Sequence, residues 1–370
     1  MQANEMAAAT AAGGLDYREV RKIQFTGRST YVLSLPKKWV EEMGLKAGDQ
    51  VTLLREGDNS LSVVPMSSAA AAGSGSLPEA TAIILPSESP STLRRRVVSM
   101  YLAGYNIIHL KAKSGRMGPA LRDAVREVAR RNLVGTEMIA DAPDMITLQV
   151  LLSLPELSVN TAIRRMYLIA SSMHRDAMAA LAEMNAELAR EVIKSDDEVD
   201  RFSLYVLRNL VMAAQNGRVL REMGLKNPSD CLGYRAAAKS IERVADHACG
   251  IAEAAARLKE RLPKETLQKV EKMSYLALSV LGDAAEALLR RDYQLADRTV
   301  DAAGGVHALE ADAVQAMERE KVHDQAATVR LVLEDIRRTA EHASDIAEAA
   351  LNETIGEEMA MAAAEKALGR

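Results

Sequence analysis

Two pairs of acidic residues in the C-terminal half of the chain have the spacing of neighbours on a helix. Asp196 and Asp200 form one pair, with Asp197 beside them, and Glu242 and Asp246 form the other. Residues four apart share one side of a helix, where like charges destabilise it. If two helices brought the pairs together, the carboxylate oxygens would form a cage for a hard cation. The spacing therefore indicates a candidate metal site.

The same residues have an ordinary alternative interpretation. A solvated acidic face needs no ligand, and Arg201 and Arg243 lie close enough in the sequence to neutralise part of it. His247 and His342 each follow an acidic residue and could also be ligands. A His in a helix rich in small residues is more often a packed, hydrogen-bonded residue, so we expect these two to be structural.

A second cluster of charge, near the N-terminus, is basic. Only Glu19 opposes it between residues 18 and 38. Its last members stand at the start of an expected helix, where the helix dipole also favours anions. One such cluster is an ordinary solvated patch, whereas two related by a two-fold axis would suit duplex DNA. The candidate DNA-binding residues are Arg21, Lys22, Arg28, Lys37 and Lys38, and Arg18 belongs to the same cluster.

Composition and missing motifs narrow the function classes. The 370 residues carry a net charge of −4, so a nucleic-acid site must be local. We find no phosphate loop, Rossmann glycine pattern, paired-cysteine zinc motif or nucleophile elbow, and therefore expect no enzyme. Two cysteines, no long apolar run and no basic signal-peptide start predict a cytoplasmic protein without membrane insertion.

The elements that position these residues fall into zones of different composition. The first zone has β-branched runs and turn signals, which predict two strands, a short helix from Lys37 to Met43 and a hairpin around residues 57–59. About 50 residues with so small a core are marginal alone, so we expect a second copy to complete this unit. The expected segments are a disordered tail (1–15), the basic β unit (16–66) and a flexible linker (67–79).

The middle zone, residues 80–155, alternates short apolar runs with amphipathic helices. The pattern predicts a strand, a helix, a strand, a helix and two further strands. That order favours a small α+β sandwich, ferredoxin- or ACT-like in outline.

The third zone contains an internal repeat. The segment around Met166 recurs around Met273, and the segment around His247 recurs around His342. Apolar residues at helical spacing predict about three long helices in each copy. We therefore expect an all-α tandem of two three-helix bundles, residues 156–256 and 263–356, with one continuous core.

Residues 21–64 resemble the AbrB/SpoVT (MazE-like) domain. The resemblance rests on Arg-Lys-Ile-Gln from Arg21, Leu-Pro-Lys-Lys-Trp from Leu35, and Leu-Lys-Ala-Gly-Asp from Leu45. It implies a swapped-hairpin β-barrel made by two chains, which binds DNA through the basic residues named above. Some relatives bind a toxin protein or serve as assembly modules instead.

Residues 158–355 resemble the PhoU family. The resemblance rests on Ser195-Asp-Asp-Glu-Val-Asp200 and on Ile241-Glu-Arg-Val-Ala-Asp-His-Ala248. It implies two three-helix bundles, a role in phosphate-responsive control of phosphate transport, and metal binding by the acidic pairs. The expected metal is iron, zinc, manganese or magnesium, and Asp197 is a further candidate ligand.

The second repeat departs from that pattern. Ala303 and His307 align with Asp196 and Asp200, Arg337 aligns with Glu242, and only Glu341 keeps a carboxylate. We therefore expect one metal site in the chain rather than two.

The combination resembles archaeal phosphate-uptake regulators and leaves two functions open. One is a homodimeric, DNA-binding transcriptional regulator of phosphate transport genes. The other is a protein–protein adaptor that binds phosphate transporter subunits or a sensor, with the N-terminal unit as a dimer clasp only.

Overall fold

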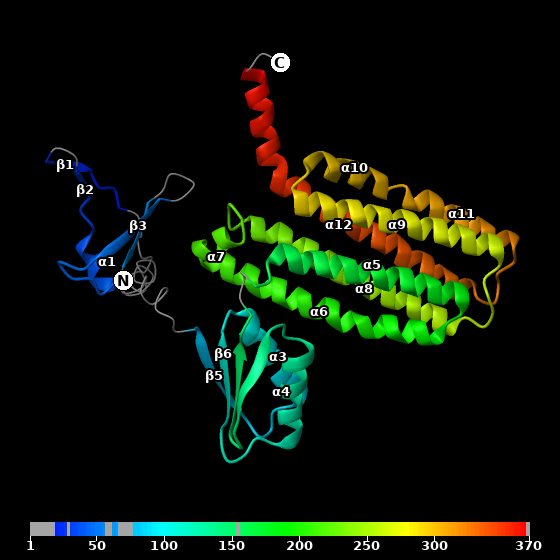
Figure 1. Ribbon diagram of the computed structural model, residues 1–370, viewed down its shortest axis with the longest axis horizontal. Helices are drawn as coiled ribbons and strands as arrows, with labels where there is room; N and C mark the ends of the chain where they lie inside the picture. Colours follow the sequence, from blue (N-terminus) through cyan, green and yellow to red (C-terminus); the bar gives the residue numbers. More distant parts are fainter. Residues whose placement is uncertain (1–18, 28–29, 56–60, 66–76, 153–155, 368–370) are drawn as a thin grey trace, which may run out of the picture. The chain divides into compact units, whose positions relative to one another are not determined.

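The computed structural model describes residues 19–27, 30–55, 61–65, 77–152 and 156–367. It divides into two compact units, residues 1–76 and 77–370 (Figure 1). The expected tail, Arg28 and most of the expected linker lie outside the described residues. The linker prediction ran one residue too far, because the first strand of the second unit begins at Glu79.

The first unit consists of two hairpins around one short helix, at the places the sequence predicts. Strands β1 (Gln24–Thr26) and β2 (Thr30–Val32) pair antiparallel, and so do β3 (Val51–Arg55) and β4 (Leu61–Pro65). Between them α1 (Lys37–Glu42) starts after Pro36. Gly44 follows the helix with a positive φ of 68°, a conformation that glycine adopts without strain.

The described residues of the first unit have no core of their own. Every residue of β1 and β2 is exposed, and α1 buries no side chain. Tyr31 is 71% exposed, and its ring packs at a tilt of 60° against that of Phe25, with centroids 5.0 Å apart. Apolar strands of this kind need a partner surface, as expected for a unit completed by a second copy.

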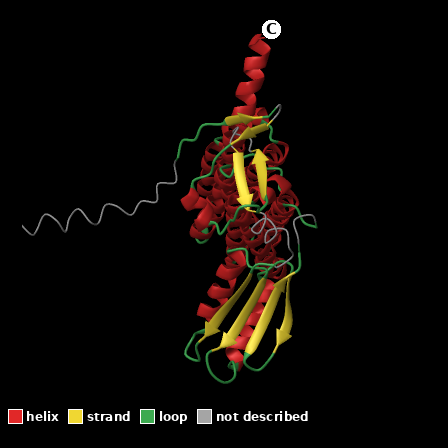
Figure 2. Ribbon diagram, turned by 90° about the vertical axis from the view of Figure 1, so that its left-hand side faces the viewer, coloured by secondary structure: helices red, strands yellow, loops and turns green. Residues whose placement is uncertain are grey.

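The middle part of the chain is the α+β layer structure predicted for it. Its strands are β5 (Glu79–Ile84), β6 (Ile107–Ala112), β7 (Thr136–Asp141) and β8 (Met145–Val150), and its helices are α3 (Pro90–Leu102) and α4 (Pro119–Arg131). Figure 2 shows the four strands side by side. The two helices pack on one face of the sheet, through Leu93 and Val97 of α3 and Val125 and Val128 of α4.

The sheet order is β5-β6-β8-β7, which corrects the ferredoxin-like outline. A ferredoxin-like sheet is antiparallel throughout, whereas β5 and β6 pair in parallel. In the second half of the sheet, β8 lies between β6 and β7 and is antiparallel to both. The difference arises since α3 returns the chain to the neighbouring position, as an ordinary βαβ crossover does.

The rest of the chain is helical. The first repeat contains α5 (Val159–Glu183), α6 (Ala186–Gln215), the short α7 (Gly217–Glu222) and α8 (Asp230–Arg257). The second contains α9 (Lys264–Arg290), α10 (Tyr293–Ala303), α11 (Val306–Arg319) and α12 (Ala326–Ala367). One hydrophobic core runs through both repeats, as the pattern predicted. Figure 1 shows the last turns of α12 projecting beyond α9 and α10.

The repeat is visible in backbone detail. Met184 ends α5 and Arg291 ends α9, both left-handed with φ of 57°. The next residue caps the following helix in each copy: Asn185 accepts from the backbone N–H of Leu188, and Asp292 from that of Leu295. These positions differ by the same 107 residues as the sequence repeat.

The two copies differ at the middle helix. In the first copy α6 is continuous over 30 residues, whereas in the second Gly304 and Gly305 separate α10 from α11. A side chain at Gly305 would lie 3.2 Å from the Ala302 carbonyl oxygen. The interruption falls at the position equivalent to the acidic Asp196–Asp200 stretch, so the second copy has lost the local helix as well as the carboxylates.

A buried arginine joins the middle part to the first helical repeat. Arg208 of α6 is 3% exposed and inserts at the end of α3. Its guanidinium donates to the carbonyls of Tyr101, Gly104 (3.1 Å) and Tyr105 (2.9 Å) and to the Asn106 side chain (3.0 Å). It also lies 4.8 Å above the Tyr101 ring. These contacts supply donors to the carbonyls of Gly104 and Tyr105, which follow α3, and a second donor to that of Tyr101.

Candidate functional site

The acidic pairs of the first repeat lie on neighbouring helices, as the spacing predicted. Asp196 and Asp200 are half-buried on α6, and Glu242 and Asp246 lie on α8, which packs against it. Burial raises the pKa of Asp196 to about 6, and the charges of Asp246, Asp197 and Glu242 add to that shift. Burial raises the pKa of Asp200 to about 6 as well, with Asp196 the next cause. The four carboxylates therefore form one electrostatic group.

Their oxygens do not form a preformed metal cage. Within the part of the chain that the structure describes, no three Asp, Glu, His or Cys side chains converge so that they could hold one metal ion. Glu242 accepts instead from the Ser203 hydroxyl at 2.9 Å and from Lys239. Asp197 points elsewhere: its side chain is 55% exposed and lies 3.8 Å from Arg131 of α4. One oxygen of Asp196 is buried without a hydrogen-bond partner, which is the one feature that suits an added cation.

The equivalent place in the second repeat is filled by Arg337. Its guanidinium forms ion pairs with Glu334 and Glu341 and lies 3.4 Å from Glu310 of α11. A fixed positive charge surrounded by carboxylates leaves no need for a cation.

Three histidines meet where the two repeats pack. His247 of α8 hydrogen-bonds with Asp335 of α12 at 2.9 Å, and His342 with Asp345 at 3.0 Å. His174 of α5, which the sequence reading passed over, is fully buried and hydrogen-bonds with Ser274 of α9 at 2.9 Å. Burial lowers its pKa to about 4, with Arg175 and His247 adding to the effect. His247 and His342 are therefore both hydrogen-bonded to a carboxylate, as expected for packed histidines.

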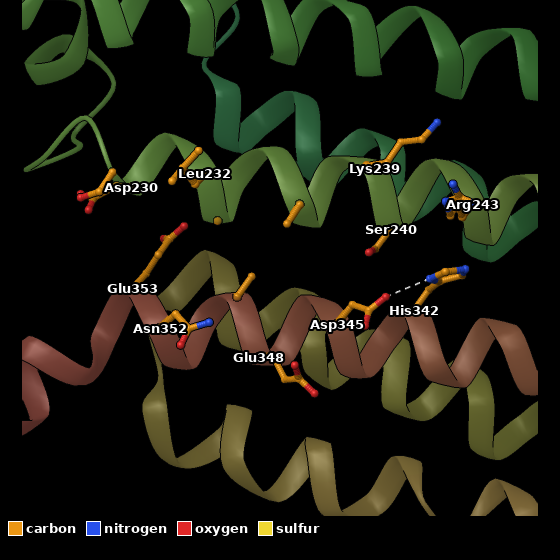
Figure 3. Close-up of a pocket in the computed structure, with 14 residues that line it drawn as sticks. Asp230, Leu232, Lys239, Ser240, Arg243, His342, Asp345, Glu348, Asn352 and Glu353 are labelled. Carbon is orange, nitrogen blue, oxygen red and sulfur yellow. Dashed lines mark hydrogen bonds and ion pairs between the residues drawn. The ribbon is translucent and has the colours of Figure 1, made fainter.

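A cavity of about 720 Å³ lies between α8 and α12, and it was not predicted from the sequence. Figure 3 shows its two ends: Glu353 and Asn352 at one, and Lys239, Arg243 and His342 at the other. The Glu353 side chain is 5% exposed and lies 3.6 Å from Arg291. Burial raises the pKa of Glu353 to about 8 against the opposing effect of Arg291, so the carboxyl is mostly neutral at pH 7.

Gly233 makes room for this carboxyl. A Cβ at Gly233 would lie 2.2 Å from Glu353 Oε1, so any other residue here would force the Glu353 side chain to move. Gly250, further along α8, admits Asp335 of α12 in the same way, at 2.5 Å. Glycine inside a helix destabilises it by roughly 1 kcal/mol. The two glycines inside a predicted helix were therefore the signal that could have indicated close helix packing here.

The described basic residues of the N-terminal unit lie at its surface. Arg21 pairs with Glu19, and Lys22 is exposed. Lys37 lies 3.6 Å from Glu41, and Lys38 lies 3.9 Å from Glu42. Such exposed pairs are weak, so the lysines remain able to contact phosphate groups. The two glutamates follow at i+4 and were overlooked in the sequence reading.

No helix of the described residues combines the length and the apolarity needed to cross a membrane.

Two protein-family models match parts of the chain. Residues 163–255 and 270–350 match the PhoU domain, and residues 24–70 match the antidote-toxin recognition MazE family of bacterial antitoxins. The middle part between them matches neither.

Individual relatives agree with the first match. A PhoU homologue 1 of Thermotoga maritima, named a phosphate-specific transport system accessory protein, is 26% identical over 204 residues, which is 53% of this chain and 86% of the relative. The homologue of Aquifex aeolicus is 28% identical over 130 residues, 34% of this chain and 55% of its own length. The crystal structure of PhoU from Pseudomonas aeruginosa is 19% identical with a TM-score of 0.48, covering 54% of this chain and 96% of that one.

Proposed function

Because this chain carries a PhoU domain behind a MazE-like N-terminal domain, we propose that it regulates phosphate uptake in response to phosphate, by binding DNA and controlling the transcription of phosphate transport genes. The proposed role in phosphate uptake rests on the PhoU relatives, whose names assign them to a phosphate-specific transport system.

One observation carries the DNA-binding part: the first unit has exposed apolar strands beside an exposed basic cluster. Strands without a core are completed when two chains interlace, which gives a homodimer. Dimerisation doubles the basic residues and relates them by a two-fold axis. That arrangement supports backbone contacts to duplex DNA by Arg21, Lys22, Arg28, Lys37 and Lys38.

A mobility-shift experiment tests this function. The full-length protein is mixed with its own upstream DNA and with unrelated DNA of equal length, at about 50 and 200 mM salt. Regulation by DNA binding predicts a preference for the upstream sequence and a steep loss of affinity at the higher salt. Equal binding of both DNAs would reduce the proposal to non-specific contact.

A second function, that of a protein–protein adaptor, has one observation in its favour. Glu41 and Glu42 lie opposite Lys37 and Lys38 and lower the net charge of α1. In this alternative the N-terminal unit serves as a dimer clasp and the helical part binds transporter subunits or a sensor. Failure to bind DNA at low salt, with the dimer intact by sedimentation, favours the adaptor.

We also propose one metal ion per chain at the acidic face of the first repeat, held by Asp196, Asp200, Glu242 and Asp246. The proposal rests on the buried, unpartnered oxygen of Asp196 and on the raised pKa values of the carboxylates. Because the side chains do not converge as they stand, metal binding requires side-chain rotation. Iron, zinc, manganese and magnesium are the ions to test.

A further inference from the structure

The cavity between α8 and α12 is polarised along its length. The two helices are antiparallel there, since Gly233 faces Glu353 and Gly250 faces Asp335. Figure 3 shows Asp230, Asn352 and Glu353 at one end, the carboxylates of Glu348 and Asp345 between the ends, and Lys239, Arg243 and His342 at the other end. From Gly233 to Arg243 the groove extends roughly 15 Å, at about 1.5 Å per residue. Its volume of about 720 Å³ is that of a small-molecule site.

The cationic end has binding groups that the protein leaves unused. Arg243 forms no close ion pair or hydrogen bond with the described residues, although its charge acts on Asp246 and opposes the rise in the pKa of that carboxyl. Ser240, on the same face of α8, points toward α12 in Figure 3, and among the described residues its hydroxyl has no hydrogen-bond partner either. A guanidinium with a neighbouring hydroxyl is a suitable site for phosphate oxygens.

The opposite end suits a planar, uncharged group. Asn352 has both an amide donor and an amide acceptor, neither of which is paired within the described part of the chain. Burial raises the pKa of Glu353 beneath it to about 8, and the carboxylate of Asp230 lies at the same end. Between the ends, Ala236 and Ala349 leave a shallow apolar surface on which a ring can lie.

The middle of the groove carries Glu348 on α12. Its carboxylate makes no ion pair or hydrogen bond with the described residues. A carboxylate at this place can accept from the hydroxyl groups of a ribose, as acidic residues do in many nucleotide sites.

We propose that this groove binds a purine nucleotide, with its base at Asn352, its ribose at Glu348 and its phosphates at Arg243 and Ser240. The order of groups along the groove matches base, sugar and phosphate in sequence. The site adjoins the acidic face, since Lys239 of the cavity pairs with Glu242, but it does not depend on the proposed DNA binding.

Calorimetric titration of the full-length protein tests the proposal. The probes are ADP and ATP, with adenosine, inorganic phosphate and tripolyphosphate as partial ligands. We expect ADP or ATP to bind more tightly than any partial ligand. Arg243→Gln should weaken nucleotide binding roughly ten-fold or more and leave adenosine binding nearly unchanged, since a hydrogen-bonded charge is lost only from the phosphate end. Asn352→Ala should weaken both.

A matched control is Arg235→Gln, which removes an exposed arginine from the same helix outside the cavity. Its affinity for nucleotide should equal that of the unaltered protein. The melting temperature of each variant is measured to exclude unfolding. No binding of ADP or ATP at millimolar concentration, tripolyphosphate binding as tight as ATP binding, or equal loss in Arg235→Gln would overturn the nucleotide site.

Discussion

His247 and His342 occupy the same position in the two repeats and stack on each other, with ring centroids 5.5 Å apart and planes inclined by 19°. The stack lies where α8 and α12 pack, and Asp335 of α12 bonds to His247 beside it. Asp335 reaches this place because Gly250 has no side chain. The hydrogen bond between Asp335 and His247, at the contact between the two repeats, therefore depends on the absence of a side chain at Gly250.

Replacing that glycine should destabilise the fold. A methyl group at residue 250 would lie 2.5 Å from Asp335 Oδ2 and would displace the partner of His247. We expect Gly250→Ala to lower the free energy of unfolding by about 1–3 kcal/mol, measured by urea denaturation. Gly356→Ala is the control: nothing lies within 4 Å of its added Cβ, so the better helix propensity should stabilise α12 by about 0.5–1 kcal/mol. Equal effects at both positions would contradict the packing argument.

Dimerisation of the first unit can be tested through its exposed strands. Leu53 of β3 is exposed in the single chain and is expected at the interface between two copies. Leu53→Asp should shift the full-length protein from dimer to monomer in sedimentation equilibrium, because a carboxylate would be buried without a partner. Leu331→Asp, at an exposed position of α12, is the control and should leave the dimer intact. A dimer insensitive to Leu53→Asp would place the interface elsewhere.

Lys37 and Lys38 should contact phosphate groups rather than bases. Changing each to Ala should weaken DNA binding about equally for all sequences and reduce the slope of log affinity against log salt by about one per lost contact. Lys259→Ala, in an exposed loop of the second unit, is the charge-matched control. Unchanged affinity and slope in both lysine variants would rule out this face as the DNA-binding surface.

The acidic face predicts an unusual dependence of stability on pH. The pKa of Asp196 and of Asp200 is raised to about 6 from an ordinary value of 3.8, so both are more easily protonated in the folded protein. Their contribution to stability is complete below pH about 4 and is lost as the pH rises through 6. In chelator we therefore expect the free energy of unfolding to fall by about 1 kcal/mol per group between pH 4 and 7, after allowance for solvent screening of half-exposed carboxylates.

Asp196→Asn should flatten that dependence. If a metal binds there, added iron, zinc, manganese or magnesium should raise the melting temperature at pH 7 in the unaltered protein but not in Asp200→Asn combined with Asp246→Asn. Metal analysis of protein purified without chelator gives the stoichiometry, which should be one per chain. Metal content that is the same in the double variant would assign the bound ion to other residues.

Arg208 should be essential for the joint between the middle part and α6. Arg208→Met leaves the carbonyls at the end of α3 without donors and should lower the free energy of unfolding by about 2–4 kcal/mol. Arg208→Lys should rescue little, since an ammonium group cannot reproduce the planar donors of a guanidinium. Arg201→Lys, which keeps its pair with Glu198, is the control and should change stability by less than about 0.5 kcal/mol.

Helices, strands and turns were predictable from the sequence because they depend on residues close together in the chain, and the repeat was visible as recurring segments. The turn at Gly44, the cap at Asn185 and the heptad-like apolar spacing of the long helices each involve residues a few positions apart. Contacts between segments far apart in the sequence were not predictable. The insertion of β8 between β6 and β7, the pairing of Asp197 with Arg131, and the burial of Glu353 against Gly233 depend on which elements meet in space. The acidic pairs lie on one face as predicted, and the direction of each carboxylate required the structure.

The contact between Arg208 and the middle part also constrains how this protein can evolve. An arginine on α6 and its acceptors near Tyr105 are about 100 residues apart in sequence but act as one contact. An exchange of the middle part by recombination would separate the two and leave a guanidinium without acceptors in the recipient. We therefore expect homologues to inherit the segment from Glu79 to the end of α6 as a block, and to lose Arg208 only together with the segment that it binds.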